Sequence, residues 1–490
     1  MATYNVLYLT SELYPFAKVG GLADVAGALP KALKELEHDV RVFLPKYKVI
    51  RDRKWNLREV IRLRDIEVPL GGKTHIVSVK SGFVPDSKVQ AYFLEYKPFF
   101  DRKDIYINPK TGEGWQDDAQ RFALFAKAAL ETLKVLFWQP DLIHCNDWPS
   151  ALVPYYLQSD YKDDEFFKNT KTVLTIHNFA YQGLFPPEVA PQIDMNDFDS
   201  KHLAYHQGSV GFLKAGIATA DQITTVSPSY AQQIIKPHEW WNGLDKDLKK
   251  RNSDLTGILN GIDSTVWNPE TDKLIAANYS RGDLSGKAEC RQALIDEFKL
   301  EKSDERMIIG LIGRLVDQKG LDLLLEGMDK LLELPVNFVI LGTGHKEIEE
   351  KLTKLATKNP GQVAVLIDHD DDLAHRIEAG ADAFLMPSKY EPCGLNQLYS
   401  LRYGTPPMVH GTGGLADTIN EFNGKTGNGF RFDQYRAVGL VATVKRALKV
   451  FKDEKAWKKL QQNGMKEDND WTKSGKALAK VYGKAVSAKS

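Results

Sequence analysis

The chain has 490 residues, with 65 basic and 65 acidic side chains and a hydrophobic content of 43%. At roughly 150 residues per domain, this length predicts more than one hydrophobic core. Because the formal net charge is zero, no overall field would attract the chain to nucleic acid or to an anionic membrane. The composition is that of an ordinary globular protein. Any anionic ligand must therefore bind in a local pocket.

The cysteines and the first residues indicate a compartment. Cys145, Cys290 and Cys393 lie far apart, are odd in number and lack metal-ligand spacing, which fits a reducing environment. The strand-like run Val6 to Leu9 comes without the basic and long apolar segments of a signal peptide. No apolar run approaches the length of a membrane span. We therefore expect a cytoplasmic protein.

Short apolar runs alternate with segments of helical period, a pattern typical of βαβ units and a parallel sheet. The first strand is expected at 5–12, followed by glycines and an amphipathic helix that Pro30 should kink. Further strands of the first half are expected at 39–44, 141–145, 172–177 and 222–226.

The pattern restarts at residue 307, where 307–320 predicts a strand, a glycine turn, a charged loop and a helix. Later strands are expected at 336–344, 363–367, 383–388 and 407–414. With a crossover near 260–269, the chain is predicted to be an α/β protein with two Rossmann-like, doubly wound domains facing a central cleft. Ligands of such sheets bind outside the carboxyl ends of the strands, so functional residues should follow strands.

Cations and glycines follow one strand in each half. KVGGL at 18–22 places Lys18 before a glycine pair and Asp24 inside the next helix, where N–H groups can bind an anion. Arg314 and Lys319 lie between a strand and a helix, where two cations could clamp a diphosphate. A tight turn and solvated surface cations would explain each feature alone. Their shared place at strand ends favours a functional role.

The segment YEPCGLNQL at 390–398 places Glu391 and Pro392 at the expected start of a helix. Glu391 is then either a helix cap or a buried carboxylate that binds sugar hydroxyls. Cys393 is expected to pack rather than act as a nucleophile, because no base is evident near it.

Polar and aromatic residues follow two neighbouring strands of the first half. They are His144, Asn146, Asp147 and Trp148, and then His177, Asn178 and Tyr181. Polar groups for hydroxyls and a flat face for a ring suit a sugar site, although a lone histidine is usually structural. The acidic run Asp370–Asp372 is interpreted as a solvated turn rather than a magnesium site.

Taken in order, eight segments resemble bacterial glycogen synthases and plant starch synthases. They are KVGGL at 18, HCNDW at 144, TIHNFAYQG at 175, VSPSYA at 226, ILNGIDSTVWNP at 258, GRLVDQKGLD at 313, PSKYEPCGLNQL at 387 and GTGGLADT at 411. The resemblance implies the GT-B fold and transfer of glucose from ADP-glucose to the non-reducing end of an α-1,4-glucan, with retention of configuration. It implies no required metal or other cofactor.

The resemblance also implies domains and residue roles. It implies an acceptor-side domain at 1–258, onto which a helix at about 472–490 packs back, and a nucleotide-sugar-binding domain at 259–471. The implied catalytic residues are Glu391, Asp147, His177, Arg314 and Lys319. The implied donor-binding residues are Lys18, Gly20, Gly21, Asp24, Asn260, Cys393, Gly394, Leu395 and Asn396. Trp148 would face the acceptor glucan.

Some positions depart from the family pattern on the nucleotide side. DHDDDLAHRI at 368–377 lacks the aromatic residue that often stacks on the base, although His369 could substitute. Asn396 stands where threonine is common, and His410-Gly411 stands where bacterial members often carry arginines. ADP-glucose remains the expected donor, with UDP-glucose as the alternative.

Three other functions are compatible with parts of the sequence. The nearest is another retaining GT-B transferase with a small sugar acceptor. A nicotinamide dehydrogenase is disfavoured, because GTGHKE at 342–347 lacks the third glycine of the dinucleotide fingerprint. A non-catalytic glucan-binding protein would not need Lys18, Arg314, Lys319 and Glu391 together.

Overall fold

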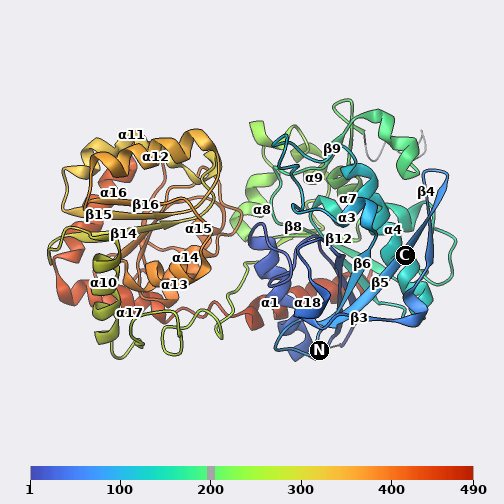
Figure 1. Cartoon of the computed structure of the whole chain (residues 1–490), viewed down its shortest axis with the longest axis horizontal. Helices are drawn as coiled ribbons and strands as arrows, with labels where there is room; N and C mark the ends of the chain where they lie inside the picture. The colour runs from blue at the N-terminus through green and yellow to red at the C-terminus, as the bar shows by residue number, and fades with distance from the viewer. Residues whose placement is uncertain (1, 196–204, 489–490) are drawn as a thin grey trace. The chain divides into compact units, whose positions relative to one another are not determined.

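The chain folds into two compact units, seen in a computed structural model that describes residues 2–195 and 205–488 (Figure 1). Unit 1 runs to Asn260 and includes the chain from Trp471 onward, and unit 2 is Gly261–Asp470. Each unit has its own sheet and helices, which confirms the predicted α/β class.

The sheet of unit 1 has the strand order β13-β12-β8-β7-β1-β2-β6-β5-β3, with β4 beside β5. Its parallel strands are β1 (Asn5–Leu9), β2 (Asp39–Pro45), β6 (Gln90–Glu95), β7 (Leu142–Asn146), β8 (Lys171–Ile176), β12 (Gln222–Thr225) and β13 (Leu255–Gly257). The edge is antiparallel and comprises β3 (Arg58–Glu59), β4 (Ile66–Leu70) and β5 (Lys73–Phe83). The predicted parallel sheet is thus confirmed for most of unit 1, and this antiparallel edge is a feature that the sequence analysis did not predict.

Helices cover this sheet, and a small second sheet lies beside it. Helices of unit 1 include α1 (Gly21–Glu35), α2 (Asp52–Trp55), α3 (Lys97–Phe100), α4 (Asp118–Leu136), α5 (Leu152–Gln158), α7 (Phe212–Thr219), α8 (Pro228–Ile234), α9 (Asp245–Lys250) and α18 (Trp471–Ser487). The small sheet consists of β9 (Leu184–Phe185), β10 (Tyr205–His206) and β11 (Ser209–Gly211). Helix α1 begins after Gly20 and runs through Pro30 as a single element.

The last helix, α18, packs on α1 and is bonded into the interior of unit 1. Gly475 lies so close to α1 that a Cβ there would be 3.3 Å from Leu36. Ser474 donates to the Leu259 carbonyl at 2.5 Å, and the Tyr482 hydroxyl lies 2.7 Å from His144 Nδ1. The last two positions of the helix expected at about 472–490 lie outside the described residues.

Unit 2 contains a parallel sheet with the strand order β16-β15-β14-β17-β18-β19. The strands are β14 (Met307–Ile312), β15 (Val336–Leu341), β16 (Val363–Leu366), β17 (Ala383–Met386), β18 (Pro407–His410) and β19 (Phe430–Phe432). Helices of this unit include α10 (Ser285–Phe298), α11 (Leu321–Leu332), α12 (Lys346–Lys358), α13 (Asp371–Gly380), α14 (Asn396–Arg402), α15 (Gly413–Thr418), α16 (Ala437–Phe451) and α17 (Glu454–Met465).

Side chains of β14 alternate between two cores, as the period of a strand requires. Met307, Ile309 and Leu311 pack with residues of α11 and α16. Ile308 packs on the other face with residues of α10 and α13. Burial of β14 on both faces explains its continuous apolar sequence.

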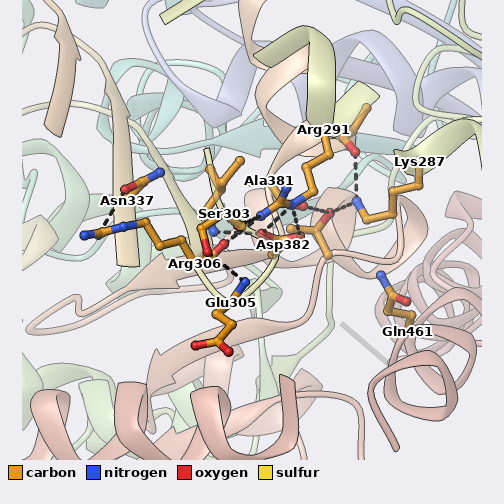
Figure 2. Close-up of polar contacts among 12 residues, drawn as sticks. Lys287, Arg291, Ser303, Glu305, Arg306, Asn337, Ala381, Asp382 and Gln461 are labelled. Carbon is orange, nitrogen blue, oxygen red and sulfur yellow. Dashed lines mark hydrogen bonds and ion pairs between the residues drawn. The ribbon is translucent and has the colours of Figure 1, made fainter. Parts of the chain in front are cut away.

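A buried ion network fixes α10 at the amino ends of these strands (Figure 2). Arg291 Nε lies 3.1 Å from both carboxylate oxygens of Asp382, just before β17. Its guanidinium also donates to the Arg306 carbonyl at 2.6 Å, just before β14, while Lys287 donates to the Ala379 carbonyl at 2.9 Å. These charged residues lie at the amino ends of the strands, away from the carboxyl ends where ligands bind. We therefore infer that they stabilise the fold.

We predict that Tyr482→Phe destabilises unit 1 by about 1–3 kcal/mol, because it leaves a ring nitrogen of buried His144 without its partner. Tyr96→Phe is the matched control, since it removes a part-buried Tyr–His bond of 3.0 Å to His75 that water can replace. Calorimetric unfolding of the three proteins would measure this. An equal loss of unfolding free energy in both variants would contradict the anchoring role of Tyr482.

Candidate active site

The glycine loop of unit 1 is held by a carboxylate that sequence reasoning missed. Buried Glu12 follows β1 and accepts hydrogen bonds from the backbone N–H groups of Val19 at 2.6 Å and Gly20 at 2.8 Å, and from the Tyr106 hydroxyl at 2.8 Å. Burial raises the pKa of Glu12, and these three donors oppose the shift. The Gly20 N–H is thus bonded within the protein, whereas the Gly21 N–H belongs to the helix start, which has no intrahelical acceptor.

Lys18 and Asp24 form an ion pair beside this loop. Their Nζ and Oδ1 atoms are 3.1 Å apart, and the side chains are 25% and 26% exposed. Asp24 lies in the first turn of α1, where the helix dipole stabilises a negative charge. The lysine is therefore placed before any ligand arrives, yet it remains accessible to one.

Asp147 adopts a strained conformation immediately after β7. Its φ of 55° and ψ of −175° lie where residues with side chains are rarely found. One carboxylate oxygen accepts the backbone N–H of His177 at 2.7 Å, and burial raises the pKa of Asp147 to about 7. The strain thus places a carboxylate at the end of β8.

The two histidines of the predicted sugar site have different environments. His177 follows β8, is half-buried, and bonds Asn146 Oδ1 through Nε2 at 2.9 Å. Burial lowers its pKa to about 3, so the ring is neutral near pH 7. His144 is only 1% exposed, and both of its ring nitrogens are bonded, to Tyr482 and Thr175. The expectation that His144 belongs to a sugar site is therefore wrong, and its role is structural.

His177 and Asn260 line one small crevice of unit 1, with a volume of about 30 Å³. Its other walls come from the ends of β7, β8 and β12 and from α1 and α18. The structure therefore brings together two of the residues that the sequence implied.

Trp148 is mostly engaged in packing. Its ring lies 4.8 Å from Phe122, 5.8 Å from Phe185 and 6.2 Å from Phe212, measured between centroids. A Cβ at Gly183 would lie 2.6 Å from the indole, so that glycine makes room for it. Contact of Trp148 with a glucan stays a prediction.

In unit 2, Lys319 and Glu391 form an ion pair of 2.6 Å between the loops that follow β14 and β17. Glu391 is 5% exposed, and the Ser388 hydroxyl donates to the same oxygen at 3.0 Å. The expected helix start at Glu391 is wrong, because α14 begins at Asn396. Glu391 is a buried, paired carboxylate in the preceding loop rather than a helix cap.

Gln318 and Gly320 hold the same two loops together. Gln318 bridges them, since its oxygen accepts from Arg314 at 3.4 Å and its amide donates to the Tyr390 carbonyl at 3.3 Å. Gly320 has φ of 71°, and a Cβ there would lie 1.9 Å from the Pro387 carbonyl. Arg314, Lys319 and Glu391 therefore belong to one rigid cluster.

The segment between Glu391 and α14 is fixed by side-chain amides. Gln397 donates to the carbonyls of Cys393 and Gly394, each at 3.0 Å. Asn396 donates to the Ile312 carbonyl at the end of β14 at 2.7 Å. Gly394 has φ of 75°, which favours glycine. Leu395 completes this loop before the helix.

Other nucleotide-side residues have structural partners. His410 donates through Nδ1 to the Ser388 carbonyl at 2.7 Å. Asp370 caps α13 by accepting the Leu373 N–H at 2.8 Å. Within residues 2–195 and 205–488, no group of three or more His, Cys, Asp or Glu side chains could hold a metal ion. Within the same ranges, no helix is long and apolar enough to cross a membrane.

A cation–carboxylate cluster at the strand ends of one Rossmann-like sheet, with a histidine and an aspartate at the strand ends of another, defines a GT-B glycosyltransferase. Family models agree with this class. Residues 5–250 match the starch synthase catalytic domain, and residues 294–467 match glycosyl transferases group 1. The chain belongs to the glycogen synthase and starch synthase family, and it is a glucosyltransferase.

Relatives cover the whole chain. It is 43% identical to a glycogen synthase of Koribacter versatilis and 40% identical to one of Chlorobaculum parvum, over 98% of both chains in each case. The catalytic domain of starch synthase IV from Arabidopsis thaliana, solved with ADP and acarbose, has a TM-score of 0.91 and 32% identity over 99% of this chain and 100% of its own. A sucrose-phosphate synthase from Thermosynechococcus elongatus, at 18% identity over 99% of this chain and 100% of its own and a TM-score of 0.61, shares the fold.

We predict that Lys319→Ala and Glu391→Gln each lower kcat for glucosyl transfer by at least about a hundredfold, as expected for a positioned electrostatic group. Lys330→Ala, an exposed change on α11 of the same unit, is the control and should stay near the wild-type rate. Near-normal kcat in either folded site variant would remove that residue from the mechanism.

We predict that kcat/KM falls as the pH drops through about 7, because protonation removes the negative charge of Asp147. The raised pKa means that the carboxylate form is fully present only above this value. In Asp147→Asn the activity should be low and without this acidic limb. A pH profile in which the limb persists in the variant would assign it to another group.

Proposed function

We propose that the protein transfers glucose from ADP-glucose to the non-reducing end of an α-1,4-glucan, with retention of configuration. The observation that carries the proposal is the joined pair of loops after β14 and β17, in which Lys319 is paired with buried Glu391 and Arg314 bonds Gln318, which also bonds the second loop. The full-length relation to glycogen synthases and to a starch synthase solved with ADP and acarbose supports the choice of substrates.

Departure of a nucleoside diphosphate builds negative charge on its phosphate oxygens, and fixed cations stabilise that charge. Arg314 and Lys319 would supply this positive charge from unit 2. Lys18 and the backbone N–H of Gly21 would supply further donors, with the backbone of Gly20 held beside them by Glu12. Lys319 is already positioned by Glu391, so little reorganisation is needed when the phosphate arrives.

The glucosyl unit needs polar groups that bind hydroxyls and electron-rich oxygens that favour its cationic character in the transition state. Glu391 would bind its hydroxyls, with the segment Cys393 to Asn396 beside it. Asp147 and His177 would lie by the anomeric carbon and the hydroxymethyl group. Asp24 and Asn260 would complete the donor site, and Trp148 would contact the acceptor.

The domain roles follow from these assignments. We propose that residues 1–258 form the acceptor side and that residues 259–471 bind most of the nucleotide sugar. ADP-glucose and the α-1,4-glucan are the proposed partners, without a further cofactor, nucleic acid or membrane. Three free, buried cysteines support a location in the reducing cytoplasm.

Transfer of labelled glucose onto glycogen should be measured from ADP-glucose and UDP-glucose in parallel, with a chelator present. We predict incorporation chiefly from ADP-glucose, with the label released as maltose by β-amylase, which digests α-1,4 chains from their non-reducing ends. Label found only in a disaccharide would favour the small-acceptor alternative. Label from UDP-glucose alone would overturn the donor assignment.

A further inference from the structure

Asn146, the last residue of β7, has an orientation that its hydrogen bonds determine. It is fully buried, and its Nδ2 donates to the Leu9 carbonyl at 2.8 Å. A carbonyl oxygen only accepts, so the amide nitrogen must lie on this side. The amide oxygen, Oδ1, therefore points to the other side as an acceptor.

Two groups lie within hydrogen-bond distance of this oxygen. The Tyr8 hydroxyl is 3.0 Å away, and His177 Nε2 is 2.9 Å away. Because Oδ1 can only accept, His177 must carry its proton on Nε2. A neutral ring with a proton there leaves a lone pair on Nδ1, which then acts only as an acceptor.

The remaining nitrogen is the one available to a ligand. In the part of the chain that the structure describes, no protein group bonds His177 Nδ1, and the ring is half-buried against the crevice that Asn260 also lines. His144 provides the contrast, since both of its nitrogens are bonded inside the protein.

We infer that Asn146 is a positioning residue that fixes His177 in the Nε2–H form, so that His177 accepts a hydrogen bond from a hydroxyl of the transferred sugar and selects for that hydroxyl. The inference rests on the proposed function, in which His177 lies by the hydroxymethyl group of the donor. A donor with hydrogen or fluorine in place of that hydroxyl cannot donate to Nδ1. Discrimination against such donors is thus set by a residue behind the histidine.

The first test measures the tautomer in the full chain labelled with ¹⁵N-histidine, with the His177 signals identified by their loss in His177→Ala. We expect the wild-type protein to show a protonated Nε2 and an unprotonated Nδ1 at neutral pH. In Asn146→Leu, which removes the acceptor and keeps the branched shape of the side chain, we expect the two tautomers to mix. Tyr8→Phe is the control, because it leaves the Asn146–His177 bond in place. A wild-type ring protonated on Nδ1 would overturn the inference, even if Asn146→Leu failed to fold.

The second test compares kcat/KM for ADP-glucose and for ADP-6-deoxyglucose. We expect the wild-type preference for ADP-glucose to fall at least about tenfold in Asn146→Leu and to be kept in Tyr8→Phe. Asn146→Asp, which retains an acceptor at the same place, should keep more of the preference than Asn146→Leu. A preference that is unchanged in folded Asn146→Leu would overturn the positioning role.

These outcomes are separate from failure of the proposed function. Loss of selectivity with continued transfer from ADP-glucose supports both statements. If the wild-type protein transferred glucose from neither nucleotide sugar, the proposed function would fail. The ¹⁵N spectra would then still decide whether Asn146 fixes the ring, while its role in sugar selection would fall with the function.

Discussion

The Lys319–Glu391 pair is the contact on which the unit 2 site depends. A carboxylate that is 5% exposed is stable as an anion only when it is paired and hydrogen-bonded, and Glu391 has both Lys319 and Ser388. The pair also joins the loops after β14 and β17, so their close approach requires glycine at position 320. Because 24% of the lysine side chain is exposed, its charge can serve both the protein and a bound phosphate.

Buried carboxylates also fix loops in unit 1, but there they accept hydrogen bonds from backbone N–H groups. Glu12 holds the glycine loop through two N–H groups, and Asp147 holds the start of the loop after β8. Glu12 fixes a segment of its own loop between β1 and α1, whereas Asp147, after β7, fixes a segment at the end of the neighbouring strand β8. A few hydrogen bonds in the loops therefore position the site residues, while the sheet brings these loops together at the carboxyl ends of its strands.

The sequence predicted most of the parallel strands, because strands buried on both faces are continuous apolar runs. It did not predict the parallel strands β6, β13 and β19. It did not predict the antiparallel edge, where β4 and β5 alternate buried and exposed residues without a helix between them. The sequence predicted a helix start at Glu391, but α14 begins at Asn396. A turn at Gly394, with φ of 75°, lies between them, and the sequence carries no clear local signal for it. His144 and His177 look equivalent in sequence, and only their surroundings separate them.

Hydrogen-bond saturation distinguishes the structural ion pair of Arg291 and Asp382 from the proposed site residue His177. At the amino ends of the unit 2 strands, Arg291 and Asp382 bond each other and neighbouring backbone groups, so a ligand would have to break existing contacts. At the carboxyl ends of the unit 1 strands, His177 uses one ring nitrogen and leaves the other available. A partly satisfied, rigidly held group costs stability unless a ligand completes it. Polar side chains therefore stabilise the amino ends of the unit 2 strands and, at the carboxyl ends of the unit 1 strands, prepare a site for chemistry.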